Sequence, residues 1–496
     1  MSRRRGLLAP ALLAGVLAAL PVPAAAQLIN LRTIPVASGD QFLIYPSENL
    51  AIGGVRIALS DPLLDPFVNP ARGADLTESQ AFAMPMFYTV GANGGNAGTL
   101  SAGGLFGGGR VFGGVLLALQ QIKGGEPFWG PVPLADFAVL PPDALANRSN
   151  TNKYATGYIG MDVGAGVAVG VSGTISDLNA VDGVEHLYAM AAQIEQSGSL
   201  ADLRLGARKQ LGNGGLIEGV ALYNHYDMTH DVYYIEWVPI DTLNWEWEQQ
   251  ERLESNRDLT NTYGLQLGFQ RPVGTSGWRV GGSITGNYKD HAKIPNYEIV
   301  NIPRDPGHST ALDFGVGIAK QANGLTVGMD LIYEPAWSST WAEADTIVIT
   351  VEGDTIPENG KTVENEFEFS NAYVNLGASY RVGPATFSGG LRLRSNDYSL
   401  DQWNNVTDET RRQDEQWMEW TPSWGARVKL KGLEFSYFGR VTTGTGRPGV
   451  AWTGAVAERA ADAGFANDIV VPPGGPLTLQ EADVWTHQFT VSVPIR

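Results

Sequence analysis

The sequence predicts an all-β fold: a transmembrane antiparallel β-barrel of about 14–16 strands with an N-terminal plug, or hatch, segment. Three observations predict this fold. Apolar and polar residues alternate with a period of two along most of the chain after residue 80. Short and long connections follow one another in strict alternation. Beyond the N-terminal segment there is no apolar run of about 18 residues, and a closed barrel is the remaining way for a chain to cross a bilayer.

The first 26 residues have the pattern of a secretory signal peptide. Three arginines, Arg3 to Arg5, precede an apolar run from Leu7 to Leu20, and Ala24-Ala25-Ala26 forms a small-residue cleavage site. We therefore expect residues 1–26 to direct the chain out of the cytoplasm. The sequence contains no cysteine, which excludes disulfides, a thiol nucleophile and a cysteine metal site.

Residues 27–80 alternate poorly and are rich in proline and aspartate. This irregular pattern predicts a packed segment without long strands, which we interpret as a hatch inside the barrel. A turn-forming Asn69 and a rigid Pro70 suit such a segment, because the hatch must be held by hydrogen bonds within a polar lumen. An ordered periplasmic extension is the alternative.

Residues 81–496 form the predicted barrel. The clearest hairpin runs from Trp424 to Val441 and turns at Lys431-Gly432, with apolar residues on one face and polar residues on the other. Fourteen strands remain possible because the first two segments alternate least. The predicted strands have these approximate limits: 81–90, 99–107, 110–121, 153–161, 165–175, 199–211, 214–227, 260–272, 276–289, 310–320, 323–335, 366–382, 385–398, 417–431, 432–443 and 484–496.

Long polar segments alternate with the short turns. The long segments lie at residues 122–152, 176–198, 228–259, 290–309, 336–365, 399–416 and 444–483. Short periplasmic turns and long extracellular loops are typical of bacterial outer-membrane barrels, so we expect the protein in that membrane, in contact with lipid and lipopolysaccharide. A secreted β-sandwich or propeller is the alternative, but the repeat of about 40–50 residues that marks a propeller is absent. A formal net charge of -18 argues against nucleic-acid partners.

Within the predicted hatch, the stretch from Gly53 to Asp61 is followed eight residues later by Asn69-Pro70-Ala71. This pattern resembles the N-terminal signature of the FadL-type outer-membrane transport proteins, although prolines 62 and 66 depart from it. The resemblance implies passive uptake of small hydrophobic, fatty-acid-like compounds without a cofactor. Related barrels serve secretion systems, so a structural barrel with a protein partner at its extracellular loops is the alternative. The hatch-motif residues are Gly53, Ala58, Asp61, Asn69, Pro70 and Ala71.

Four arginines are predicted on the lumen face of three consecutive strands, namely Arg392, Arg394, Arg427 and Arg440. Adjacent strands would bring several of them together as a ligand-binding site for a carboxylate or another anionic headgroup. The alternative is that they pair with lumen or hatch acids such as Asp40, Asp61 or Glu434 and fix the hatch.

Catalysis is the competing function class. His225, Asp227, His230 and Asp231 are close in sequence at the predicted extracellular end of a strand, where acid–histidine pairs could activate a water molecule. No matched serine and histidine can be identified. We therefore expect no enzymatic activity, no catalytic residue, no metal site and no cofactor.

Overall fold

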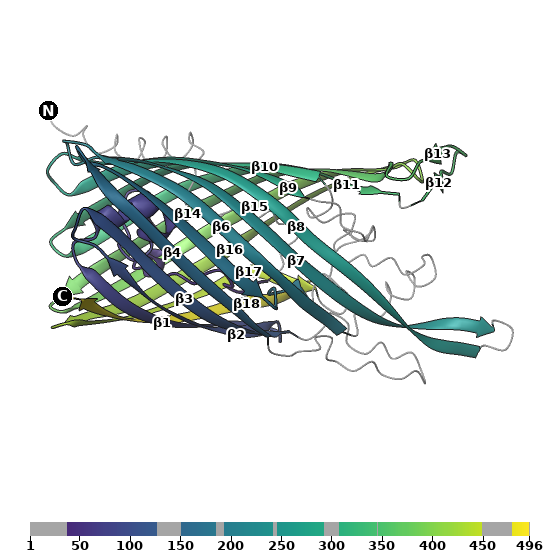
Figure 1. Ribbon diagram of the computed structural model, residues 1–496, viewed down its shortest axis with the longest axis horizontal. Helices are drawn as coiled ribbons and strands as arrows, with labels where there is room; N and C mark the ends of the chain where they lie inside the picture. Colours follow the sequence, from purple (N-terminus) through teal and green to yellow (C-terminus); the bar gives the residue numbers. More distant parts are fainter. Residues whose placement is uncertain are drawn as a thin grey trace, which may run out of the picture.

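The computed structural model describes residues 37–125, 150–184, 193–241, 246–291, 307–344, 346–448 and 479–495. The predicted signal peptide therefore lies outside the described residues. In the described part of the chain, sixteen antiparallel strands form one closed barrel in which each strand pairs with the next along the chain, and β1 pairs with β18 (Figure 1). No helix in that part is long and apolar enough to cross a membrane.

The barrel strands differ in length. They are β1 (Ser79–Val90), β2 (Gly95–Phe106), β3 (Val111–Gly124), β4 (Asn150–Gly164), β5 (Val167–Leu178), β6 (Gln193–Gln210), β7 (Leu216–Asp241), β8 (Glu246–Val273), β9 (Trp278–His291), β10 (Gly307–Ala322), β11 (Leu325–Glu343), β14 (Lys361–Val382), β15 (Ala385–Asn404), β16 (Glu409–Leu430), β17 (Leu433–Pro448) and β18 (Leu479–Ile495). A separate hairpin joins β12 (Val348–Ile349) to β13 (Thr355–Ile356).

Every predicted strand overlaps an observed one, and the upper count of sixteen is confirmed. The predicted loops at 228–259, 336–365 and 399–416 are wrong in large part, because strands continue through much of each. The high polarity of these segments favours loops in a sequence-based prediction, but here it does not end the strands. Strand β8, for example, begins at Glu246 and stays paired with β7 through Glu251 and Arg252, inside the predicted loop 228–259.

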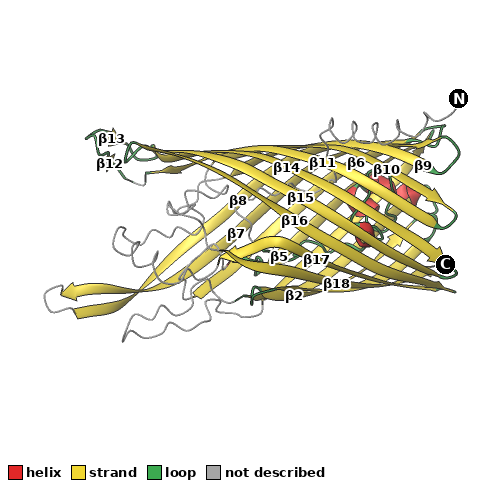
Figure 2. Cartoon of the chain, turned by 180° about the vertical axis from the view of Figure 1, so that it is seen from behind, coloured by secondary structure: helices red, strands yellow, loops and turns green. Residues whose placement is uncertain are grey.

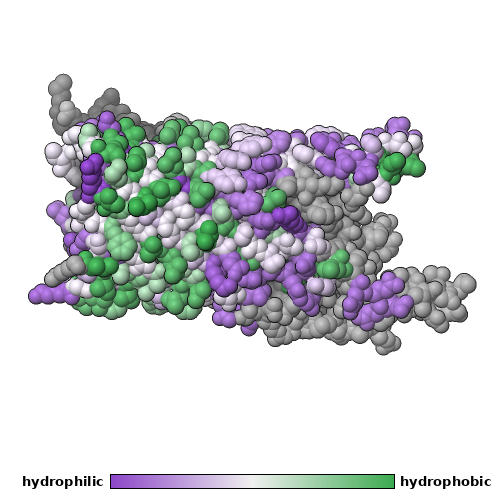
Figure 3. Space-filling model, viewed as in Figure 1, coloured by the Kyte–Doolittle hydropathy of each residue, from purple (hydrophilic) through white to green (hydrophobic). Residues whose placement is uncertain are grey.

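An apolar band covers the outer surface of the barrel near its short-turn end (Figure 3). Large apolar side chains point outward there; Leu205 of β6 and Leu117 of β3, for example, are 64% and 65% exposed. Aromatic side chains lie exposed among them, including Trp278, Tyr380 and Trp485. The strands continue beyond this band toward the long-connection end, where the outer surface becomes polar.

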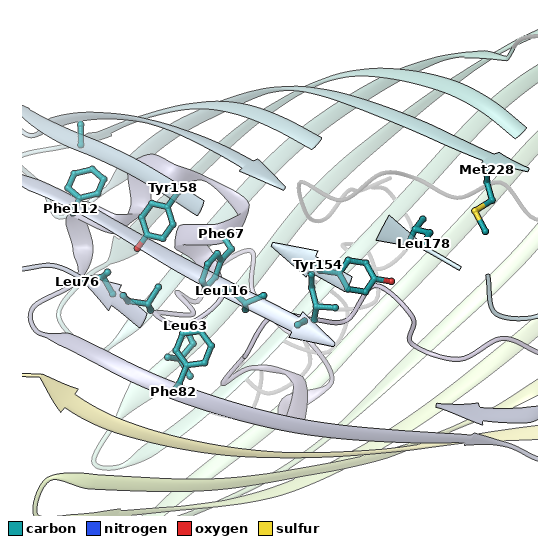
Figure 4. Close-up of a cluster of buried hydrophobic side chains, with 14 residues drawn as sticks. Leu63, Phe67, Leu76, Phe82, Phe112, Leu116, Tyr154, Tyr158, Leu178 and Met228 are labelled. Atoms are coloured by element: carbon teal, nitrogen blue, oxygen red, sulfur yellow. The ribbon is translucent and has the colours of Figure 1, made fainter. Parts of the chain in front are cut away.

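The hatch lies inside the barrel near the short-turn end, where Figure 2 shows its short helices enclosed by strands. It contains η1 (Leu50–Ile52), α2 (Asp65–Val68) and η2 (Pro70–Asp75). Phe67 of α2 stacks on Tyr45 at 5.0 Å and packs edge-on against Phe82 and Tyr158 of the wall, within a buried apolar cluster (Figure 4). This apolar contact holds the hatch against β1 to β5.

On the opposite wall the hatch backbone approaches the strands so closely that a side chain would not fit. A Cβ atom on Gly377 would lie 2.1 Å from the Ile52 carbonyl oxygen, and one on Gly390 would lie 2.1 Å from the Gly53 nitrogen. Glycine is therefore required at these positions. Wall glycines with a hatch atom within 3 Å of the added Cβ form what we call the glycine belt: Gly170, Gly206, Gly281, Gly317, Gly328, Gly377, Gly390 and Gly425.

Candidate functional site

Asp61 organises the hatch by accepting hydrogen bonds. Its carboxylate accepts from the Ser47 hydroxyl at 2.5 Å and from the backbone N–H groups of Glu48, Asn49, Leu63 and Leu64 at 2.9–3.2 Å. Burial, together with the nearby carboxylates of Asp65 and Glu48, raises the pKa of Asp61 to about 6. Each of these hydrogen-bond donors belongs to the hatch, so this motif residue shapes the segment from within.

The Asn-Pro-Ala part of the motif fixes the hatch to the wall. The side-chain Nδ2 of Asn69 donates to Glu218 of β7 at 2.8 Å, while its Oδ1 caps η2 by accepting from the Ala71 N–H at 3.1 Å. Pro70 lies against Gly170, and the Ala71 carbonyl accepts from Arg208 at 3.3 Å.

Gly53 and Ala58 serve the same attachment on the other side of the lumen. Gly53 adopts a left-handed conformation with φ of 73° and donates its N–H to the Ser423 hydroxyl at 3.0 Å. Ala58 is fully buried beside Val55 and Ala319. The six motif residues therefore lie in one docked segment, and their observed contacts are within the hatch or with the wall.

The four predicted lumen arginines contact different partners. Arg440 pairs with Asp40, and Arg427 pairs with Glu48 while lying 3.6 Å from Glu434. These contacts match the alternative in which arginines hold the hatch, and Glu48 is an acid that the sequence prediction did not name. Asp61, the third acid of that alternative, forms no ion pair with them in the described residues.

Arg394 and Arg392 lie higher in the lumen on β15. Arg394 donates to Glu334 of β11 at 3.3 Å and stacks over the Tyr373 ring at 4.6 Å. Arg392 donates its Nε to the Asn375 amide oxygen at 2.9 Å and forms no ion pair with a carboxylate in the described part of the chain. Its guanidinium lies against Gly54 of the hatch, and Arg392 is the one of the four predicted arginines without an ion pair among the described residues.

A layer of polar side chains follows above Arg392. Glu334 accepts from the Tyr373 hydroxyl at 2.5 Å and from the Asn371 amide at 3.4 Å, in addition to Arg394. Strands β11, β14 and β15 supply these groups at neighbouring register positions. The layer is compact because cross-strand neighbours on one face lie within side-chain reach.

Above the polar layer, toward the long-connection end, the inner face is aromatic. Phe369 lies 5.8 Å from Tyr398 and 6.0 Å from Phe367, and Trp417 meets Tyr398 edge-on at 6.2 Å. We call these four residues, with the packed Ala311, Ala336 and Leu400, the lumen aromatic cluster. Sequence reasoning missed it because each apolar strand face was assigned to the outside of the barrel. The alternation of Glu366 and Glu368 with the two phenylalanines was the available signal.

The candidate catalytic residues do not converge. His225 is partly exposed and contacts Asn261 at 2.8 Å, and Asp227 pairs with Arg257 at 2.7 Å. His230 is buried and points to the opposite side of β7 from His225 and Asp227, because successive side chains of a strand alternate between its two faces. Asp231 points to the same side of β7 as His225 and Asp227.

No family model matches the chain, and no curated protein matches it. Among solved structures, a Pseudomonas aeruginosa FadL homologue is similar with a TM-score of 0.44 and 10% identity over 92% of this chain and 99% of that one. The Pseudomonas putida toluene transporter TodX has a TM-score of 0.36 and 10% identity over 90% and 96%. CdiB from Acinetobacter baumannii has a TM-score of 0.40 and 10% identity over 85% of this chain, which spans only 60% of the CdiB chain. At these scores and identities, none of them assigns a family or a function to the protein.

Proposed function

We propose that the protein is a bacterial outer-membrane β-barrel that admits small hydrophobic, fatty-acid-like compounds passively, without catalysis or a cofactor. The observation that carries this proposal is the lumen sector on β14 and β15. There a guanidinium without a carboxylate partner, that of Arg392, lies between the docked hatch and the lumen aromatic cluster. A charged group below and apolar rings above together suit an amphipathic ligand.

Placement in a membrane is supported by the outer surface. Every barrel strand carries exposed large apolar side chains, and on the face that Figure 3 shows they gather in the short-turn half; soluble proteins rarely expose so much apolar surface. The band ends where the outer face becomes acidic, at Glu366 and Glu368 on β14. We place the short turns in the periplasm and the long connections outside the cell.

The ligand would bind above the hatch. Its carboxylate would meet Arg392, since guanidinium–carboxylate pairs form strong, often bidentate hydrogen bonds. Its apolar chain would extend toward Phe369 and Tyr398. Lipid, lipopolysaccharide and the hydrophobic compound are thus the partners that this proposal requires.

Binding of decanoate to the purified barrel tests the proposal. We expect Arg392→Gln to weaken decanoate binding by about tenfold or more, because a charge-assisted hydrogen bond is lost, and to leave binding of decanol nearly unchanged. The matched control is Arg412→Gln on β16, whose exposed guanidinium lies 3.5 Å from Asp401 and Asp414. A wild-type barrel that takes up no decanoate, in binding or in proteoliposome assays, would contradict the proposal.

A protein-binding barrel is the second candidate, and one observation favours it. Strands β7 and β8 contain 26 and 28 residues, whereas β1, β2 and β5 contain 12 each, so the β7–β8 hairpin extends past its neighbours (Figure 1). If this hairpin is a docking arm, a partner protein should purify with the barrel. Shortening the hairpin by residues 234–253 should release that partner while decanoate binding persists.

A further inference from the structure

Asn396 lies on β15 between the polar layer around Arg394 and the lumen aromatic cluster around Tyr398. These three residues are successive inward-facing positions of the strand. Its side chain is 1% exposed, yet neither its Oδ1 nor its Nδ2 atom has a hydrogen-bond partner. Trp417 stands directly opposite Asn396 in the β15–β16 register, and the buried Nε1 of Trp417 is also unpaired. The Nε of Arg394 is the third unpaired donor of this group.

Nearer the hatch, by contrast, the buried amide side chains of the neighbouring strand β14 are hydrogen-bonded. Asn371 donates to Glu334 and accepts from the Asp397 N–H at 3.3 Å, and Asn375 accepts from Arg392. Buried polar atoms are normally hydrogen-bonded, and each exception requires an explanation. A leucine would fill the space of Asn396 without leaving polar atoms unpaired, so the amide has no evident packing role.

We propose that Asn396, Trp417 and Arg394 bind the polar substituent of an aromatic ligand whose ring packs in the lumen aromatic cluster, an aryl carboxamide being the simplest such compound. This inference rests on the proposed function and names a ligand class for the upper part of the same lumen. The carboxamide N–H would donate to Asn396 Oδ1. Its carbonyl would accept from the Nδ2 of Asn396 or the Nε1 of Trp417. Entry requires the neighbouring rings to rearrange around the ligand.

The chemistry of the three side chains selects a neutral group with both a donor and an acceptor. They offer three donors and one acceptor. A hydrocarbon would leave all four unpaired, and a carboxylate would leave Asn396 Oδ1 unpaired. A second anion is also disfavoured here, because Glu334 contacts Arg394 and Glu419 stands opposite Arg394 in register. Anionic groups therefore belong at Arg392, and neutral polar aromatics belong one layer above it.

The surrounding aromatic side chains favour a ligand that contains an aromatic ring. Tyr398 and Phe369 are tilted by 36° and Trp417 meets Tyr398 at 78°, so the rings of the cluster already pack on one another at several angles. Aromatic pairs prefer such offset or edge-on arrangements and stabilise each other beyond simple burial. A flat ring therefore fits this environment better than a flexible alkyl chain.

Calorimetric titration of the full-length barrel in detergent with 3-phenylpropanamide, propylbenzene and decanoate tests the inference. The wild-type barrel should prefer the amide over propylbenzene by about tenfold or more, since a site built for hydrogen bonding rejects analogues that lack the polar group. Asn396→Leu should remove about tenfold of that preference and leave decanoate affinity within about twofold. Trp417→Phe should reduce the preference in the same direction and serves if the Asn396 variant does not fold.

Asn365→Leu is the matched control, because Asn365 is a fully buried amide on β14 that is already bonded to Gln402 at 2.8 Å. An unchanged amide-to-hydrocarbon ratio in both Asn396→Leu and Trp417→Phe would overturn the inference. Decanoate binding distinguishes failure of this inference from failure of the proposed function. If decanoate binds in an Arg392-dependent manner while the ratio does not respond, only this inference fails; if no probe binds the wild-type barrel, the proposed function fails as well.

Discussion

Single glycines decide where the hatch can sit. At the glycine belt the wall has no side chain, and hatch atoms occupy the space that a Cβ would need. Polar contacts then hold the segment in register, such as the donation from the Gly53 N–H to Ser423. The hatch is therefore a fitted part of the wall's inner surface, and its position depends on residues far from it in the chain.

Adding one methyl group to the belt should loosen the hatch. We expect Gly390→Ala to destabilise the docked hatch by about 1–3 kcal/mol, because the new Cβ overlaps the Gly53 backbone and overpacking has costs of this size. Faster hydrogen–deuterium exchange in residues 49–60 would report it. Gly389→Ala is the control, since its Cβ would lie 3.9 Å from the Ser423 carbonyl oxygen, in ordinary van der Waals contact. Equal exchange in the two variants would contradict a steric role for the belt.

Individual strands pass through two environments along their length, and the polarity of their outward side chains changes accordingly. Along β14 the outward side chains are apolar near the short turn, as at Leu376 and Tyr380, and acidic farther along, at Glu366 and Glu368. The inward face changes in the opposite sense, from Gly377 to Phe369. A strand that crosses from lipid to water must reverse its polarity in this way, because the solvent outside it changes while the period of two does not.

This reversal predicts where a charge is tolerated. Leu205→Arg on β6 should destabilise the barrel in lipid bilayers by about 2–4 kcal/mol, the cost of an arginine on the lipid face near the bilayer midplane. Glu368→Arg on β14 should change stability by less than about 0.5 kcal/mol, as expected for an exposed surface position. Folding titrations in phosphatidylcholine vesicles measure both. A Leu205→Arg barrel as stable as the wild type would indicate that the apolar band does not face lipid.

At the scale of the whole molecule, the barrel is wider than its wall side chains can fill. Closed barrels of about 16 strands generally leave an aqueous channel. Here the hatch occupies the short-turn part of the lumen, held by the apolar contacts of Phe67 and by its close approach to the glycine belt. A ligand that passed through would therefore have to move around the hatch or displace it.

Deleting the hatch should open the barrel. In planar lipid bilayers we expect the wild-type protein to conduct ions weakly and a variant lacking residues 37–77 to show porin-like conductance, because the glycine belt would then line open space. Circular dichroism of the variant establishes that the strands remain. An intact strand signal without a rise in conductance would show that another segment closes the lumen.

The strands could be predicted well because their signals are local. Alternation along Tyr263 to Phe269, or a turn such as Lys431-Gly432, is visible within a few residues, and sixteen strands follow from such patterns. The extents of β7, β14 and β16 could not be predicted in the same way. High charge density favours a loop prediction, although a strand that has left the lipid can carry charge, as β16 does at Arg411 and Arg412.

The candidate site was predicted in part. All four lumen arginines were named, but their roles depend on contacts such as Arg440 with Asp40, which are 400 residues apart. The sequence by itself determined the order and direction of the strands and limited their number to about 14–16, because alternation and turns are properties of neighbouring residues. The tertiary structure decided which arginine stays unpaired, which faces become aromatic inside and where the hatch docks. Those outcomes depend on which distant side chains share the lumen once the barrel closes.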